Sequence, residues 1–411
     1  MAIKENSADL FQRQKLEREK ELSQKSKICD LFITALFCVF IFGFAILHIL
    51  IPDKEKSESE NRVLEKFPEF SSESLFSGEY TSNMTKYLSD QFPFRDFFIT
   101  VKASSENVLL RMENGGIMYG DDTLTARLDS PDTENLSVNL EAVKGFSTAL
   151  ENAGIPTVFA PAGRRVDVCL DDLPLSFGTY SQNELWSEID RVGNELDCTY
   201  LNLRDPLMNK ASTGEEVYFR TDHHWNTMGA YYAYSEIWHN LPESVTADVE
   251  FRKADSFTRE TVTEDFLGTS FSSSGASWIT PDKIELFRFE GDDTMPVTVM
   301  DTGETHKGLY YREYLDLRDK YSVFLGENHG RVDIGNKDRK TIVIIKDSFA
   351  QSVTPFFAAD FDVILIDPRY TTGSIFRTVT EISPDAVVIL MNADTLTSSA
   401  VLRPLMRGVK G

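Results

Sequence analysis

The sequence predicts an α/β domain, built on a mostly parallel sheet with helices on both faces, that follows one transmembrane helix. Three observations support this prediction. Short β-prone runs alternate with amphipathic helical runs from about residue 115 onward, which is the pattern of βαβ units. The strand-like runs near the C-terminus are almost entirely apolar, as expected for strands covered on both faces. A long uncharged apolar run lies near the N-terminus.

The uncharged run, LFITALFCVFIFGFAILHILI, extends from Leu31 to Ile51. At about 1.5 Å per residue it forms a helix of roughly 30 Å, which matches the hydrocarbon core of a bilayer. A cleaved signal peptide and a buried core helix are the alternatives. The run is too long for a signal peptide's apolar region, and no small-x-small cleavage site follows it. We therefore expect a transmembrane helix over residues 28–51.

The distribution of basic residues predicts the orientation of this helix. Basic residues are denser before the run (Lys4, Arg13, Lys15, Arg18, Lys20, Lys25 and Lys27) than after it (Lys54, Lys56, Arg62 and Lys66). Because positive charge favours the cytoplasmic side, residues 1–27 should form a cytoplasmic charged tail. The main domain should then lie outside the cytoplasm, anchored to the cell membrane by a single pass.

The composition excludes one class of partner and leaves one question open. The chain has 411 residues, 41% of them hydrophobic, and a formal net charge of -23. An acidic chain cannot supply the basic surface that nucleic acids require, so we expect no nucleic-acid binding. Of the four cysteines, Cys169 and Cys198 lie outside the membrane segment. An oxidising compartment could join them, and both the disulfide and the free thiols stay open.

The part of the chain that we expect to be exported divides into regions of different sequence pattern. Residues 52–114 read as a charged stalk and a helical lead-in, interrupted at Phe92 to Arg95, which we expect to pack on the main domain. The α/β domain should occupy residues 115–411, with strands in GIMYG, IPTVFAPA, TYLNL, TIVIIK, FDVILID and AVVILMNAD. A stretch at about 251–335 lacks a helical period, and we expect it to be an insertion of loops and short strands over the sheet edge.

A serine follows the strand candidate TIVIIK and precedes a helix-like run. Ligands of α/β domains bind at the carboxyl ends of parallel strands. A serine there presents its Oγ to the cleft, with its backbone N–H near a helix N-terminus that can receive an oxyanion. Ser348 is therefore a candidate nucleophile. The alternative is that Asp347 or Ser348 only caps the helix, since both types are preferred N-caps.

The segment TDHHW places two of the chain's six histidines side by side, after an aspartate. If the chain continues extended, Asp222 and His224 project to one face and His223 to the other. A carboxylate can then orient the imidazole of His224, whose other nitrogen takes the proton of a nucleophile. His223 and Trp225 are expected to support this pair, Trp225 by packing under the loop. Asn226 or Thr227 should cap the following helix.

Two other interpretations of TDHHW compete with the catalytic one. A metal site would need Asp222, His223 and His224 as ligands, but adjacent ligands face opposite ways in an extended chain, and no HExxH or cysteine cluster supplies another strong ligand. We therefore expect no metal. The other interpretation is a hydrogen-bonded cluster with a purely structural role.

Several motifs together resemble a known family. The segments SENRVLEKFPEF, SDQFPFRD, TDHHW, FLGENHG and VIIKDSFA, in this order, are similar to those of the bacterial DHHW proteins. The chain also resembles, more distantly, the SGNH-hydrolase-like proteins that O-acetylate alginate. This resemblance implies a flavodoxin-like SGNH-type sheet and a triad of Asp222, His224 and Ser348. Lys346-Asp347-Ser348 stands where ordinary SGNH hydrolases have Gly-Asp-Ser, so a glycine that eases the turn is missing.

The resemblance also implies a function. We expect an O-acetyltransferase that acts on a cell-surface or secreted polysaccharide through an acetyl-enzyme, beside a membrane-bound O-acyltransferase. Gly326 and Asn328 are candidate oxyanion donors, and Tyr370 could stack on a sugar. No cofactor is expected, since a partner or a small molecule would supply the acetyl group. The alternatives are a carbohydrate acetylesterase with the same triad and a non-catalytic glycan-binding or assembly protein.

Overall fold

The computed structural model describes residues 7–57, 62–127, 132–172 and 182–409. They form two compact units. The first unit contains the described residues up to Phe97, and the second extends from Phe98 onward. The second unit thus begins before residue 115, where the sequence pattern placed the start of the α/β domain.

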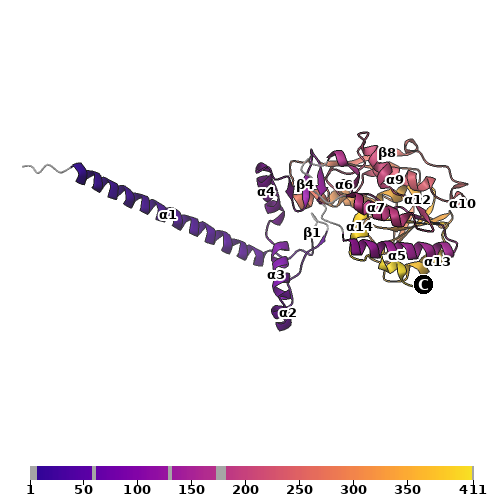
Figure 1. Cartoon of the computed structure of the whole chain (residues 1–411), viewed down its shortest axis with the longest axis horizontal. Helices are drawn as coiled ribbons and strands as arrows, with labels where there is room; N and C mark the ends of the chain where they lie inside the picture. The colour runs from indigo at the N-terminus through magenta and orange to yellow at the C-terminus, as the bar shows by residue number, and fades with distance from the viewer. Residues whose placement is uncertain (1–6, 58–61, 128–131, 173–181, 410–411) are drawn as a thin grey trace, which may run out of the picture. The chain divides into compact units, whose positions relative to one another are not determined.

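The first unit is helical (Figure 1). Helix α1 (Ser7–Leu50) is continuous from Ser7 of the charged tail into the apolar run. Its segment Gln24–Leu50 is long and apolar enough to cross a membrane. The helices of the lead-in are α2 (Ser72–Ser77), α3 (Glu79–Asp90) and α4 (Arg95–Val108), the last continuing into the second unit, and β1 (Lys56–Ser57) pairs with β2 (Arg62–Val63).

The lead-in is interrupted where the sequence predicts. The interruption lies between α3 and α4, where no helix is formed. Several large apolar side chains of the lead-in are exposed, among them Phe70, Phe76 and Phe94. The packing of the lead-in on the main domain stays a prediction.

The second unit is organised around an eight-stranded sheet of order β11-β10-β12-β14-β13-β15-β6-β7. Strands β14, β13, β15, β6 and β7 are parallel, and β12, β10 and β11 extend the sheet with antiparallel pairs. The predicted, mostly parallel α/β sheet is confirmed. The strands are β6 (Thr157–Phe159), β7 (Thr199–Tyr200), β10 (Pro296–Val299), β11 (Glu304–Lys307), β12 (Arg331–Ile334), β13 (Thr341–Lys346), β14 (Asp362–Ile366) and β15 (Ala386–Leu390).

The order of the parallel strands indicates where a ligand should bind. In chain order the parallel part reads fourth, third, fifth, first and second strand, which is the flavodoxin-like order circularly permuted, with β13 in the place of the first strand. The order reverses between β13 and β15, and crevices form outside the carboxyl ends of such strands. The end of β13 therefore lies at the expected position of a site.

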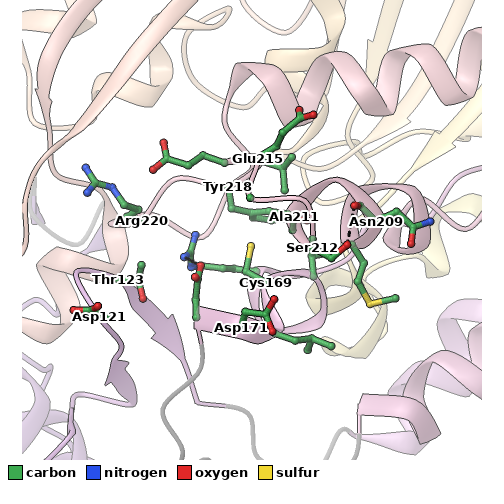
Figure 2. A pocket seen from close by; sticks show the side chains of 18 of the residues that line it. Asp121, Thr123, Cys169, Asp171, Asn209, Ala211, Ser212, Glu215, Tyr218 and Arg220 are labelled. Carbon is green, nitrogen blue, oxygen red and sulfur yellow. Dashed lines mark hydrogen bonds and ion pairs between the residues drawn. The ribbon is translucent and has the colours of Figure 1, made fainter.

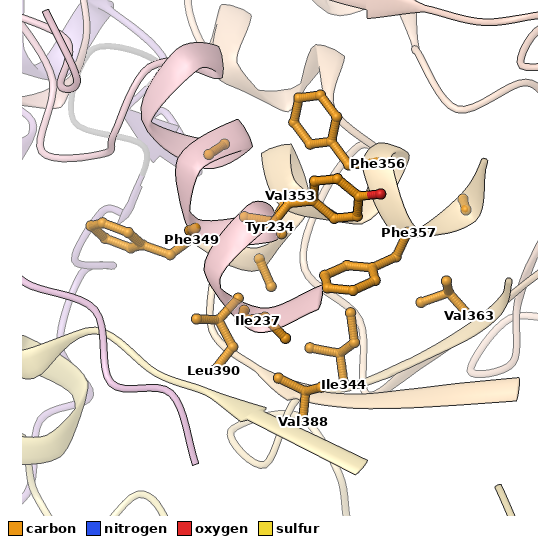
Figure 3. Close-up of a cluster of buried hydrophobic side chains, with 14 of the residues drawn as sticks. Tyr234, Ile237, Ile344, Phe349, Val353, Phe356, Phe357, Val363, Val388 and Leu390 are labelled. Carbon is orange, nitrogen blue, oxygen red and sulfur yellow. The ribbon is translucent and has the colours of Figure 1, made fainter. Parts of the chain in front are cut away.

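Helices cover both faces of the sheet because alternate residues of each strand point to opposite sides. On β13, Val343 and Ile345 pack with residues of α5 (Thr133–Asn152), α7 (Gln182–Gly193) and α13 (Ile375–Ile382). Ile342 and Ile344 pack with residues of α9 (Thr227–His239) and α12 (Ala350–Ala358). Figure 3 shows this second cluster, in which Tyr234 of α9 and Phe357 of α12 lie beside the sheet residues. The shorter helices are α6 (Arg165–Val168), α8 (Arg204–Ala211), α10 (Glu243–Thr246), α11 (Thr269–Ser274) and α14 (Ala393–Thr397).

Two segments, the GIMYG strand and the region 251–335, differ in their strand pairing from the sequence prediction. The GIMYG strand, β4 (Ile117–Tyr119), is not part of the main sheet but pairs antiparallel with β3 (Glu113–Asn114) and β5 (Leu124–Ala126). Gly115 and Gly116, both at positive φ, form the tight β3–β4 turn. In the region 251–335, β8 (Thr258–Phe266) pairs with β9 (Asp282–Arg288), and β10 to β12 widen the main sheet.

The structure separates Cys169 from Cys198. Cys169 packs in the cluster on the α9 and α12 face, whereas Cys198 packs against the cluster on the α5 face. Both are free thiols. The disulfide considered from the sequence is therefore absent, because the sheet lies between the two side chains.

We predict that both thiols react slowly with iodoacetamide in the native protein and quickly after denaturation without reductant. Burial raises the pKa of each thiol to about 11, so little thiolate is present at neutral pH. Mass spectrometry of non-reduced peptides measures the alkylation. A peptide pair linked through Cys169 and Cys198 would contradict the prediction.

Candidate active site

Ser348 lies in the turn between β13 and α12. Asp347 holds this turn: its Oδ1 accepts a hydrogen bond from the N–H of Phe349 at 3.0 Å, and its Oδ2 accepts from the N–H of Asn392 at 2.7 Å and from Thr395 Oγ1 at 2.6 Å. The turn therefore forms with Lys346 at the position where ordinary SGNH hydrolases have glycine. Asp347 supplies the hydrogen bonds that hold the turn. The half-buried Ser348 hydroxyl is therefore available to contact other side chains.

The segment TDHHW forms a closed loop. Tyr218 and Trp225 form an antiparallel bridge, and the N–H of Phe219 donates to the carbonyl of His224 at 3.2 Å. The chain bends continuously from Arg220 to His224. The extended chain assumed in the sequence analysis is therefore wrong, since the loop reverses direction within a few residues.

The C-terminal end of this loop is anchored to two helices. The side chain of Asn226 accepts a hydrogen bond from the N–H of Gly229 at 2.9 Å and caps α9. The indole N–H of the buried Trp225 donates to the carbonyl of Phe349 and to Ser352 Oγ, at 3.0 Å each. Trp225 thus connects the loop directly to the turn and helix that carry Ser348.

Three side chains form a hydrogen-bonded series at the end of β13. Asp222 Oδ1 lies 2.6 Å from His224 Nδ1, and His224 Nε2 lies 2.8 Å from Ser348 Oγ. Asp222 is 2% exposed and His224 is 5% exposed. A carboxylate that accepts from Nδ1–H leaves Nε2 unprotonated and able to take the hydroxyl proton. This arrangement can perform nucleophilic acyl transfer.

Further hydrogen bonds fix the carboxylate of Asp222. Oδ1 also accepts from the N–H of His224 at 3.0 Å, and Oδ2 accepts from the N–H and the hydroxyl of Thr269 at 2.8 and 3.0 Å. Gly268 lies so close that a Cβ added to it would be 2.3 Å from Asp222. Sequence reasoning missed both residues, because they are 46 and 47 residues from Asp222 and no local pattern connects them.

The imidazole of His224 is also held by a ring. The ring of Tyr321 stacks on it with centroids 3.9 Å apart and planes 5° apart. The Tyr321 hydroxyl bonds to the carbonyl of Ser348 and to Ser352 Oγ, at 3.1 Å each. Tyr321 was also missed, although its hydroxyl and ring contact two of the three residues in the series.

His223 lies beside His224 rather than on the opposite side. The two ring centroids are 3.8 Å apart, and Nδ1 of His223 is 2.7 Å from Thr269 Oγ1. The side chain of His223 is 43% exposed. The predicted opposite orientation is therefore wrong, but His223 does contact the groups that it was expected to support.

The bent loop removes the geometric objection to a metal ion. Ligand atoms of Asp222, His223 and His224 all lie within 4.8 Å of one another. However, two ligands of a tetrahedral zinc ion, each about 2.0 Å from the metal, are about 3.3 Å apart. The 2.6 Å separation of Asp222 Oδ1 and His224 Nδ1 is instead that of a proton-sharing pair. These atoms as placed fit a hydrogen bond better than a shared ion.

The predicted oxyanion residues occupy different environments. The N–H of Gly326 already donates to the carbonyl of Ser322 at 2.9 Å, so Gly326 is wrong as an oxyanion donor. Asn328 Oδ1 accepts from Lys346 Nζ at 2.5 Å. Tyr370 is 54% exposed. Within the described parts of the chain, the N–H of Ser348 has no acceptor, and it precedes the N-terminus of α12.

Lys346 introduces a buried charge network below the turn. The side chain is 2% exposed, and its Nζ lies 3.8 Å from Asp367 Oδ2. Asp367 in turn pairs with Arg369 at 2.6 Å. Burial lowers the pKa of Lys346 to about 8, against the opposing effect of Asp367. Lys346, which stands where ordinary SGNH hydrolases have glycine, is thus paired with Asp367 and hydrogen-bonded to Asn328.

The electrostatics of the series favour the state that a general base requires. Burial lowers the pKa of His224 to about 4, and repulsion from His223 acts in the same direction, while Asp222 opposes both. Burial alone would raise the pKa of Asp222, but His223, His224 and the hydrogen bonds hold it well below its ordinary value. At neutral pH the series therefore holds a carboxylate and a neutral imidazole.

A cavity of about 520 Å³ is lined by another part of the same loop (Figure 2). Tyr218 and Arg220 line it, together with Cys169 and Asp171, but none of the three residues of the series does. This cavity is therefore separate from the place where Ser348 Oγ meets His224.

Two protein-family models match parts of the sequence. Residues 118–291 match the SGNH hydrolase-like domain of the acetyltransferase AlgX, and residues 60–140 match the DHHW protein family. The first match includes Asp222 and His224 and ends before Ser348. The sequence has no significant match among curated proteins. The resemblance to DHHW proteins and SGNH hydrolase-like acetyltransferases is confirmed.

Two solved structures are similar to this chain. A DHHW family protein from Eubacterium siraeum DSM 15702 has a TM-score of 0.58 at 19% identity, over 72% of this chain and 96% of that protein. PatB1 from Bacillus cereus, in a structure with a sulfonyl adduct, has a TM-score of 0.57 at 18% identity, over 69% of this chain and 97% of PatB1. At these identities the similarity establishes the shared fold.

Gly268→Ala should slow the reaction of Ser348 with a serine-directed sulfonyl fluoride by about 10²-fold, because the new methyl group displaces Asp222 and misplaces His224. The labelling rate is measured by intact-protein mass spectrometry, with circular dichroism to establish folding. Gly373→Ala is the matched control, since a Cβ there meets nothing within 4 Å. Equal rates for both folded variants would contradict the role assigned to this close contact.

His223→Gln should move the acid limb of Ser348 labelling to higher pH. Labelling requires neutral His224, so the wild-type rate falls as the pH drops through about 4. Removing the repulsion from His223 raises the pKa of His224, and the rate of the variant then falls at a higher pH. His239→Gln, on an exposed histidine of α9, is the control and should leave the limb in place. An unshifted limb in His223→Gln would contradict this electrostatic coupling.

Proposed function

We propose that this chain, which resembles DHHW proteins and SGNH hydrolase-like acetyltransferases, is a membrane-anchored O-acetyltransferase that modifies a polysaccharide outside the cytoplasm. The observation that carries the proposal is the series Asp222–His224–Ser348, with separations of 2.6 and 2.8 Å, at the carboxyl end of β13. The matched domain model, described as an acetyltransferase, supports the reaction class.

In the first half-reaction, Ser348 Oγ attacks the carbonyl carbon of an acetyl donor, and His224 Nε2 takes the hydroxyl proton. The tetrahedral intermediate carries an oxyanion, to which the N–H of Ser348 at the start of α12 can donate. The intermediate then expels the donor's leaving group, which takes the proton from His224. An acetyl ester on Ser348 remains.

In the second half-reaction, a sugar hydroxyl attacks this ester while His224 takes its proton. Collapse of the second intermediate breaks the bond to Ser348 Oγ, which recovers the proton from His224. Asp222 keeps the Nδ1 proton in place and stabilises the imidazolium that forms in each step. Water in place of the sugar would convert the same machinery into an esterase, so exclusion of water decides the outcome.

The proposed setting combines the anchor with the chemistry. The apolar segment Gln24–Leu50 suits a single membrane pass, and the excess of basic residues before it favours an exported domain. An acetyl group on that side of the membrane needs a supplier, and we propose a membrane-bound O-acyltransferase as the partner. No cofactor of its own is needed for the two half-reactions.

Ser348→Ala and His224→Ala should each reduce acetyl transfer from p-nitrophenyl acetate to an oligosaccharide by about 10²–10⁴-fold or more, since the residues act as one unit. Asp222→Asn should preserve the shape but reduce transfer by permitting the wrong imidazole tautomer. His223→Ala should be milder. Mass spectrometry measures acetylated oligosaccharide and free acetate separately, with folding checked by circular dichroism.

Full activity in folded Ser348→Ala or His224→Ala would exclude the triad. If the wild-type protein releases acetate and forms no acetylated oligosaccharide, the esterase replaces the transferase. If the wild-type protein produces neither, a glycan-binding or assembly role remains. All three outcomes are read from the same assay.

A further inference from the structure

The chain returns to its membrane helix after leaving it. Helix α1 ends at Leu50, and yet the rings of Phe92 and Phe44 stack with centroids 5.2 Å apart. The ring of Tyr87 packs edge-on against His48, with centroids 5.4 Å apart. All four residues belong to the first compact unit. Helix α3 and the residues that follow it therefore lie against the last turns of α1, as Figure 1 also shows.

Hydrogen bonds hold this return in place. The Tyr87 hydroxyl donates to Asp53 Oδ1 at 3.0 Å, just after the end of α1. The side chain of Gln91 bonds to both the N–H and the carbonyl of Lys54, at 3.0 and 2.9 Å. The corner between α1 and α3 is therefore built from specific contacts.

These contacts determine the depth of α3 relative to a bilayer that surrounds α1. At about 1.5 Å per residue, Phe44 lies roughly 9 Å before the end of the helix and His48 roughly 3 Å before it. A ring stacked on Phe44 must then lie within the outer layer of the bilayer. Figure 1 shows α2 and α3 running across the axis of α1 rather than along it, so they lie in the plane of that layer.

The two flanks of α3 differ in polarity. Tyr87 points to the buried side, and Leu88 and Lys86 are each about 100° from it, in opposite directions. The flank of Leu88 continues into Phe92, whereas the flank of Lys86 carries Glu79 and Asp90. Leu88 is 47% exposed in water.

More apolar side chains of the first unit are exposed nearby in the sequence. Phe76 on α2 is 89% exposed, and Phe70 and Phe94 are 65% and 63% exposed. Isolated exposed apolar residues are ordinary, but a set of large rings within one small unit indicates a surface that is covered in use. Lipid is the occupant that α1 itself brings to this unit, because Tyr87 of α3 and Phe92 both contact the apolar part of α1.

We propose that α2, α3 and the Phe94 turn form an interfacial collar that inserts its apolar side chains into the lipid bilayer around α1. The collar does not carry the basic surface that binds anionic lipid. Its acidic residues (Glu65, Glu69, Glu73, Glu79, Asp90 and Asp96) outnumber its basic ones (Lys66, Lys86 and Arg95). Binding therefore rests on apolar burial and needs no anionic lipid. This inference rests on the proposed membrane anchor but is independent of the proposed chemistry.

The test uses the full chain in phosphatidylcholine vesicles whose acyl chains are brominated near the headgroup. Tryptophan is introduced by Leu88→Trp or Phe76→Trp, and by Lys86→Trp as the matched control on the charged flank of α3. The native four tryptophans give a common background that is subtracted. We expect bromine to quench the added fluorescence of Leu88→Trp and Phe76→Trp at least about twofold more than that of Lys86→Trp.

Phe42→Trp, within the apolar segment of α1, reports insertion of the helix. Strong quenching of Phe42→Trp with equal, weak quenching of the three other variants would overturn the collar, leave the anchor intact and favour a protein partner as the cover. No quenching of Phe42→Trp would overturn the anchor and the collar together. Acetyl transfer by Ser348 is assayed separately, so loss of the collar and loss of the proposed reaction are distinguishable.

Discussion

The arrangement of the candidate site depends on the closure of one loop, between Tyr218 and Trp225. The bond from Phe219 N–H to the carbonyl of His224 reverses the chain, and the indole of Trp225 connects the loop to the turn that carries Ser348. His224 is thereby placed 2.8 Å from a hydroxyl that is 124 residues away in the sequence. Exclusion of water from this loop strengthens both hydrogen bonds of the imidazole and also keeps it neutral.

The parts of the fold that depend on local pattern could be predicted from the sequence. Strands β13, β14 and β15 each contain at least four consecutive apolar residues, and Ser348 lies two residues after β13, so both the sheet and the candidate nucleophile have local signals. Two other features depend on which strands pair with one another: β4 pairs with β3 and β5, and β10 to β12 join the main sheet. No local sequence pattern identifies these pairing partners.

The same distinction applies to the site. The sequence prediction chose His224 over His223 by assuming an extended chain. The loop is bent instead, and His224 lies within hydrogen-bond distance of both Asp222 and Ser348. Its role as the base stays a prediction. Tyr321 and Thr269 contact the site from distant segments, and only the tertiary structure brings them there. Gly326 was chosen by residue type, and its N–H proves to be used within its own turn.

The order of strands along the chain has a consequence for biosynthesis. Of the strands in the main sheet, β6 and β7 are made first, but β6 lies between β7 and β15, the last strand to be made. The N-terminal pair therefore stays at the edge of an incomplete sheet, and His224 has no serine beside it, until nearly the whole domain has emerged. Because β15 lies between β13 and β6, truncation before β15 removes the strand that joins the part of the sheet next to Ser348 to the β6–β7 pair.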